Sequence, residues 1–102
     1  PMAATGSTIV EVLNHYKKNL EGPAKKFIAI HLIITPEYIR HVTKEHPDLI
    51  VFGIRLDRGF SSDKVLNSIP GTYPDEEFGL NNHQYIVPGG GGLGEVLNNS
   101  FV

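Results

Sequence analysis

The sequence predicts an α/β fold in three layers, with a mostly parallel β-sheet flanked by helices. Two amphipathic helical patterns alternate with two apolar segments rich in branched side chains, and the connections between them are short. This alternation is typical of βαβ units, in which a crossover helix joins two parallel strands. The chain has 102 residues, of which 40% are hydrophobic and 20% charged, so it is the size of one domain with one core.

The first predicted helix covers residues 7–20, and no strand is expected before it. Apolar side chains recur at the spacing of an amphipathic helix, at Ile9, Val12, Leu13, Tyr16 and Leu20. The hydroxyl groups of Thr5, Ser7 and Thr8 are candidates for its N-cap. The Gly-Pro dipeptide at 22–23 predicts where the helix has ended.

Two segments, 26–34 and 49–56, are apolar almost throughout and predict strands buried on both faces of a parallel sheet. A third, short strand is expected at residues 84–87, before Pro88 and the glycine-rich run 89–94. Three strands and two helices cannot cover both faces of such a sheet. The chain is therefore expected to be part of a larger α/β unit, incomplete as given.

The second predicted helix begins after Thr35. That hydroxyl is a suitable N-cap, Pro36 suits the first helical position, and an acidic residue follows in the first turn. The helix is expected to run to about Glu45, with Ile39 and Val42 facing inward.

Residues 57–83 combine glycines, prolines and polar side chains and predict an unusually long irregular excursion. Asp57 and Arg58 follow directly after a predicted strand, at the edge where open α/β sheets bind ligands. A surface turn is the simpler interpretation of this pair.

Composition excludes several classes of function. Nine basic and eleven acidic residues give a net charge of -2, which excludes nucleic-acid binding driven by overall charge. The absence of cysteine excludes disulfides and thiolate chemistry. The longest apolar run is too short to span a bilayer and no signal peptide is visible, so a cytoplasmic location is expected. The histidines are not spaced as metal ligands, and no protein-held metal is expected.

Small and hydroxyl-bearing residues at 4–8 open the first helix. Backbone N–H groups at such a helix start can approach a phosphate, and the helix dipole favours its charge. A plain helix cap is the alternative interpretation.

A second candidate binding element is the glycine run. Gly89, Gly91 and Gly94 formally match the dinucleotide-binding fingerprint, but the chain ends before the helix, strand and acidic residue that this motif requires. We therefore reject that interpretation. A loop whose backbone closely approaches a ligand, or a simple turn, remain open.

Residues 1–8 resemble a known substrate loop. Their sequence, PMAATGST, is similar to the phosphoribosyl pyrophosphate (PRPP) loop of uracil phosphoribosyltransferases, Asp-Pro-Met-x-Ala-Thr-Gly-Gly-Ser. The subsequent helix, strand, Pro-Glu helix ending in His-Pro-Asp and strand ending in Leu-Asp-Arg-Gly follow the same order. Residues 85–91, YIVPGGG, resemble the uracil loop of that family.

The resemblance implies a phosphoribosyltransferase-like fold and a glycosyltransferase activity in pyrimidine salvage. Uracil and PRPP would give UMP and pyrophosphate, with magnesium carried by the pyrophosphate group of PRPP. Residues 1–102 would be the C-terminal part of a single phosphoribosyltransferase domain, with 61–83 as an irregular insertion. We therefore expect a homo-oligomer or association with an N-terminal half, and little activity from this chain alone.

The resemblance also implies site residues. It assigns PRPP binding to Pro1, Met2, Ala3, Ala4, Thr5, Gly6, Ser7, Thr8 and Gly92. It assigns uracil binding, largely through backbone groups, to Tyr85, Ile86, Gly91, Gly92 and Leu93. Rigid amides discriminate uracil from cytosine because the wrong base leaves donors and acceptors mispaired. No side chain is assigned as catalytic.

The chain departs from the family pattern in the second loop. Gly92 stands where the family has Asp, Leu93 replaces Ala, and Glu95-Val96 replaces a later Asp-Arg pair. These departures support an alternative function, a catalytically inactive domain that binds a uridine nucleotide for regulation or assembly. A purely structural role is the third hypothesis.

Overall fold

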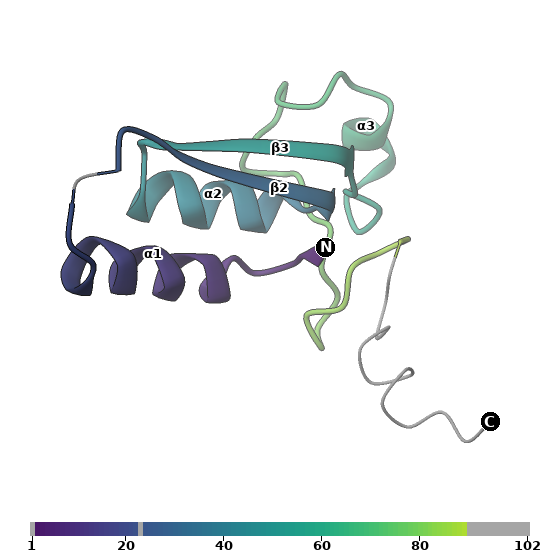
Figure 1. The fold of residues 1–102 in the computed structure, drawn as a ribbon. Helices are drawn as coiled ribbons and strands as arrows, with labels where there is room; N and C mark the ends of the chain where they lie inside the picture. The colour runs from purple at the N-terminus through teal and green to yellow at the C-terminus, as the bar shows by residue number, and fades with distance from the viewer. Residues whose placement is uncertain (1, 23, 90–102) are drawn as a thin grey trace.

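The computed structural model describes residues 2–22 and 24–89. Its elements are β1 (Met2–Ala3), α1 (Ser7–Asn19), β2 (Phe27–Ile34), α2 (Pro36–Glu45), β3 (Leu49–Leu56) and α3 (Asp63–Leu66) (Figure 1). The strands form one sheet in the order β1-β2-β3, and both neighbouring pairs are parallel. The prediction of a parallel sheet with flanking helices is confirmed.

The membership of the sheet differs from the prediction at both ends of the chain. A strand does precede the first helix, because Met2–Ala3 pairs in parallel with Ile33 and Ile34. The strand expected at 84–87 is wrong: Ile86 makes only an isolated antiparallel bridge with Leu80. The Val87 backbone bonds to neighbouring loops instead of to a sheet edge, as described below.

The start of α1 differs in detail from the hydroxyl cap expected. Gly6 is the N-cap residue, in the left-handed conformation with φ of 85°, and no cap side chain bonds to the helix. Thr5 assists from one position earlier, since its Oγ1 accepts from the Ser7 N–H at 3.4 Å. The helix buries Val10 and Leu13 and carries Lys17 and Lys18 in its last turn.

Helix α2 begins as predicted. Thr35 Oγ1 accepts a hydrogen bond from the Tyr38 N–H at 3.0 Å, and Pro36 occupies the first turn. The inward face was predicted correctly at Val42, which is 1% exposed, and wrongly at Ile39, which is 37% exposed. Tyr38 is fully buried and lies one helical turn before Val42, so the buried stripe is centred one residue earlier than expected.

The excursion after β3 is irregular as predicted, apart from the short helix α3, and it is organised around Arg58. The guanidinium donates to the carbonyl oxygens of Val65 at 2.9 Å and Ser68 at 2.7 Å, and it pairs with Glu77 at 3.3 Å. Glu77 is 2% exposed. The Arg58 cation therefore holds this segment together with the buried side chain of Val65.

The same segment is anchored to the outer side of α2. Arg40 donates to the carbonyl oxygen of Pro74 at 2.7 Å, and its guanidinium lies 5.3 Å from the centre of the Phe78 ring. The Glu37 carboxylate accepts from the backbone N–H groups of Gly79 and Leu80, at 2.9 and 2.8 Å. These contacts fix the excursion to the helix that lies beside it.

Helices α1 and α2 both lie on one face of the sheet (Figure 1). The core between them and the sheet is built from Ala3, Val10, Ile34, Tyr38 and Val42. No described element covers the opposite face, where six large apolar side chains are between 38% and 80% exposed: Ile28, Ile30, Leu32, Ile50, Phe52 and Ile54. The expectation that β2 and β3 are buried on both faces is therefore wrong for the described chain, which forms two layers of the predicted three.

Candidate functional site

The carboxyl ends of the three parallel strands meet at one edge of the sheet. Strand β1 leads into residues 4–6, β2 into Thr35 and β3 into Asp57. Crevices at this edge are where open α/β sheets bind ligands. The loops that follow these strands are therefore the candidate site.

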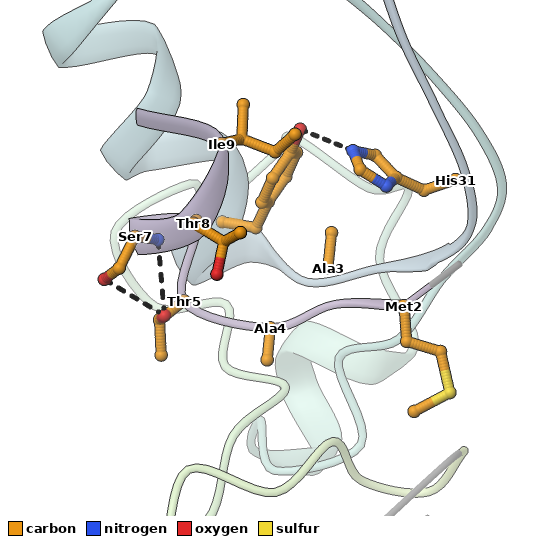
Figure 2. Close-up of a pocket in the computed structure, with 10 residues that line it drawn as sticks. Met2, Ala3, Ala4, Thr5, Ser7, Thr8, Ile9 and His31 are labelled. Atoms are coloured by element: carbon orange, nitrogen blue, oxygen red, sulfur yellow. Dashed lines mark hydrogen bonds between the residues drawn. The ribbon is translucent and has the colours of Figure 1, made fainter. Parts of the chain in front are cut away.

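The loop between β1 and α1 borders a pocket of about 380 Å³ (Figure 2). The pocket is lined by Met2, Ala3, Ala4, Thr5, Gly6, Ser7, Thr8, Ile9, His31 and Tyr38. The structure thus brings together seven of the eight residues predicted between Pro1 and Thr8, while Pro1 lies outside the described residues. Their role in binding stays a prediction.

The start of α1 has the chemistry of an anion site. The first backbone N–H groups of a helix have no partner within the helix, and its dipole places positive potential there. No acidic residue occupies the first turn of α1 to oppose an anion. The hydroxyl groups of Thr5 and Ser7 lie 3.3 Å apart beside these amides, as the dashed line in Figure 2 shows.

Two of the residues that line the pocket are a hydrogen-bonded pair of rings. His31 Nε2 lies 2.7 Å from the Tyr38 hydroxyl, and the rings meet edge to face at 80°. Burial lowers the pKa of His31 and raises the pKa of Tyr38. Each shift favours the neutral form of its ring.

Helix α2 contacts the back of the same loop. Thr35 Oγ1 donates to the Ala4 carbonyl oxygen at 2.5 Å, and His41 Nδ1 lies 2.7 Å from the Thr5 carbonyl oxygen. Sequence reasoning missed both contacts, because the partners are 31 and 36 residues apart and neither side chain belongs to a recognisable motif. The hydroxyl of Thr35 was noticed only as a helix cap.

The second predicted loop is described only at its beginning. Ile86 is 3% exposed, and neither Ile86 nor Tyr85 lines the pocket beside α1. The Val87 carbonyl oxygen accepts from the Gly59 N–H at 2.9 Å, and the Val87 N–H donates to Gly79 at 2.8 Å. The remaining predicted positions, Gly91, Gly92 and Leu93, lie outside the described residues.

Asp57 is a buried anchor, so the interpretation of Asp57 and Arg58 as a surface turn is wrong. The Asp57 side chain is 1% exposed, and its Oδ2 accepts from the Gly89 N–H at 2.8 Å. Its Oδ1 accepts from Arg55 Nε. Asp57 therefore ties the end of β3 to the start of the glycine run. Its position directly after a buried strand was the one sequence feature that pointed to this role.

Residues 2–22 and 24–89 bear on two further functions, metal binding and membrane insertion. No group of three or more histidine, aspartate or glutamate side chains could hold a metal ion within these ranges. No helix in the same ranges is long and apolar enough to cross a membrane.

Comparison with known proteins confirms the resemblance seen in the sequence. No family model matches the chain. The uracil phosphoribosyltransferase of Thermococcus kodakarensis is 34% identical over 95 residues, which cover 93% of this chain and 32% of that protein. Those of Shouchella clausii and Thermosipho melanesiensis are 35% and 34% identical over 97 residues, covering 95% of this chain and 35% and 36% of those proteins. The chain is thus homologous to uracil phosphoribosyltransferases, and spans about a third of the length of these relatives.

Proposed function

We propose that this chain carries the PRPP-binding loop of a uracil phosphoribosyltransferase, which converts uracil and PRPP to UMP and pyrophosphate. The observation that carries the proposal is the loop at 4–8, which borders a pocket at the start of α1. The homology supports it, since the relatives named uracil phosphoribosyltransferase match the chain over nearly its whole length.

In this proposal the 5-phosphate of PRPP lies at the start of α1, where hydroxyls and N–H groups without a partner in the helix donate to its oxygens. A bond forms between N1 of uracil and C1 of the ribose as the bond from C1 to the pyrophosphate oxygen breaks, and N1 loses its proton. The transition state has oxocarbenium character, so positioning and charge stabilisation contribute most to the rate. Uracil is held by backbone groups of Tyr85, Ile86 and residues 91–93.

Magnesium enters in this proposal as part of the substrate. The pyrophosphate oxygens of PRPP coordinate the ion, in keeping with the preference of magnesium for phosphate oxygens and water. Its role is to neutralise the leaving group. A cytoplasmic location stays a prediction from the sequence.

The uncovered face of the sheet is proposed to bind the polypeptide that corresponds to the other two thirds of the relatives' length. Parallel sheets are covered by helices on both faces, whereas β2 and β3 leave six large apolar side chains exposed on one. The relatives are about three times as long as the matched segment, so they contain ample chain for this layer. Association of two copies through this face is the alternative outcome.

The test is an assay of UMP formation from radiolabelled uracil, PRPP and magnesium, using the protein at its full natural length. We expect UMP and pyrophosphate in equal amounts, and no product when cytosine replaces uracil. Absence of UMP at saturating substrate would overturn the enzymatic proposal. Saturable UMP binding without turnover would instead support the inactive nucleotide-binding alternative, which the departures at Gly92 and 95–96 favour.

A further inference from the structure

We propose that His41 and Thr35 are positioning residues that aim the backbone N–H groups of Thr5 and Gly6 at the bound anion. The identity of that anion as the 5-phosphate of PRPP rests on the proposed function. The orientation of the amides rests on the contacts between α2 and the loop.

The two contacts hold successive carbonyl groups from the same side. Thr35 Oγ1 donates to the Ala4 carbonyl oxygen at 2.5 Å, and its lone pair accepts from the Tyr38 N–H at 3.0 Å. Because Thr35 is fully buried, water does not compete for its single proton. A carbonyl oxygen only accepts, so the 2.7 Å contact with Thr5 requires that His41 Nδ1 carries its proton.

Because each peptide is planar, holding its carbonyl group also fixes the direction of its N–H group. In the described residues the one cis peptide bond lies between Val87 and Pro88, so the loop peptides are trans. In a planar trans peptide the N–H of each residue points opposite to the carbonyl group before it. When α2 holds the carbonyl oxygens of Ala4 and Thr5, the N–H groups of Thr5 and Gly6 therefore point away from α2.

Gly6 completes the attachment of the loop to the helix. It takes the left-handed conformation, with φ of 85°, and lies against the same face of α2. A Cβ added there would meet Val42 Cγ1 at 3.1 Å and Tyr38 Cδ2 at 3.3 Å. Three consecutive residues of the loop are thus fixed by one helix. The Thr5 and Gly6 amides thereby join the first N–H groups of α1, which have no partner within the helix. No charged side chain of α2 is needed at the anion.

The experiment compares variants in the protein at its full natural length, with inorganic phosphate as the probe. His41→Ala removes one donor, and Thr35→Val removes the other while keeping the side-chain shape. His41→Asn and Thr35→Ser are the rescue variants, because each keeps a donor near the same place. His15→Ala is the matched control, since His15 is exposed on α1 and its ring nitrogen bonds to the Asn19 side chain of the same helix.

Amide resonances of Thr5 and Gly6 are followed by nitrogen-15 NMR during phosphate titration. We expect phosphate to shift both resonances in the wild type and in the control. Either donor-removing variant should weaken the affinity about tenfold, the effect of losing one hydrogen bond in the preorganised site. The rescue variants should return it to within about threefold. In turnover, KM for PRPP should rise more than kcat falls.

The proposal is overturned if phosphate leaves both resonances unchanged in the wild type, or if folded His41→Ala and Thr35→Val bind phosphate as the wild type does. Loss of binding that the rescue variants do not restore indicates a merely structural role and also overturns it. If one donor-removing variant does not fold, the other one and its rescue variant provide the test. Phosphate binding with these effects, but without UMP formation, would reject the proposed function and leave the positioning role intact.

Discussion

Replacing Gly6 by alanine, in comparison with the same change at two other glycines, distinguishes the cost of backbone strain from the cost of crowding against α2. Gly6, Gly22 and Gly71 all have positive φ, at 85°, 84° and 89°. A Cβ at Gly22 or Gly71 meets nothing within 4 Å, whereas at Gly6 it meets Val42 and Tyr38 at 3.1 and 3.3 Å. Alanine at each of the three positions therefore has the same backbone strain, and only alanine at position 6 also crowds α2.

The magnitudes follow from these two terms. Alanine in the left-handed region costs about 1–2 kcal/mol, which is the expected loss for Gly22→Ala and Gly71→Ala. Crowding a packed site adds about 1–3 kcal/mol, so Gly6→Ala is expected to lose about 2–5 kcal/mol in total. Movement of the loop to relieve the contact also displaces the Thr5 carbonyl group from His41 and weakens phosphate binding.

The assay is urea unfolding of the three variants beside the wild type, with phosphate affinity measured on each folded protein. A loss for Gly6→Ala no larger than the losses for Gly22→Ala and Gly71→Ala would refute the packing argument. Undiminished phosphate affinity in Gly6→Ala would refute the link between this contact and the loop.

Three further predictions follow from buried groups and from the open face. Asp57→Ala leaves the Gly89 N–H and Arg55 without their carboxylate and should lower the free energy of unfolding by about 2–4 kcal/mol; urea midpoints within error of the wild type would contradict the anchoring role. Because burial lowers the pKa of His31 below its ordinary 6.5, the unfolded chain takes up that proton first, and stability should fall as pH drops below 6.5. His31→Gln should flatten the plot of unfolding free energy against pH below 6.5. An unchanged slope in this variant would contradict the role of His31. Ile54 is 80% exposed, so Ile54→Asp should cost less than about 0.5 kcal/mol if the chain of residues 1–102 is studied alone. The same change should cost more than about 3 kcal/mol in the protein at full natural length; equally small losses in both would show that nothing covers the face.

Periodicity accounts for the elements that were predicted correctly. The segments 27–34 and 49–56 were expected within one residue of their observed bounds, because both are apolar almost throughout and rich in branched side chains. Helix α2 was placed correctly because Thr35 and Pro36 give an unambiguous start. By contrast, β1 has two residues and exists only through pairing with β2, so no local pattern can reveal it.

The candidate site was predictable where it is local and not where it is assembled by the fold. The loop at 4–8 is contiguous, and its small and hydroxyl residues are visible in the sequence. The contacts of His41 with Thr5 and of Asp57 with Gly89 join residues 36 and 32 positions apart. Polar side chains at such positions are equally compatible with a solvated surface until the topology is known.

The segment between β3 and the glycine run leaves and returns at the same place. The Phe60 N–H donates to the Phe78 carbonyl oxygen at 2.9 Å, and Gly79 lies so close to the Asp57 carbonyl oxygen that a Cβ would not fit between them. Residues 61–77 therefore form a loop with a closed neck, and the entropic cost of lengthening such a loop grows only slowly. A change in its length would therefore leave the contact between Gly59 and Val87 in place. A change in this part of the chain therefore need not alter the spacing between the loop at 4–8 and the start of the glycine run.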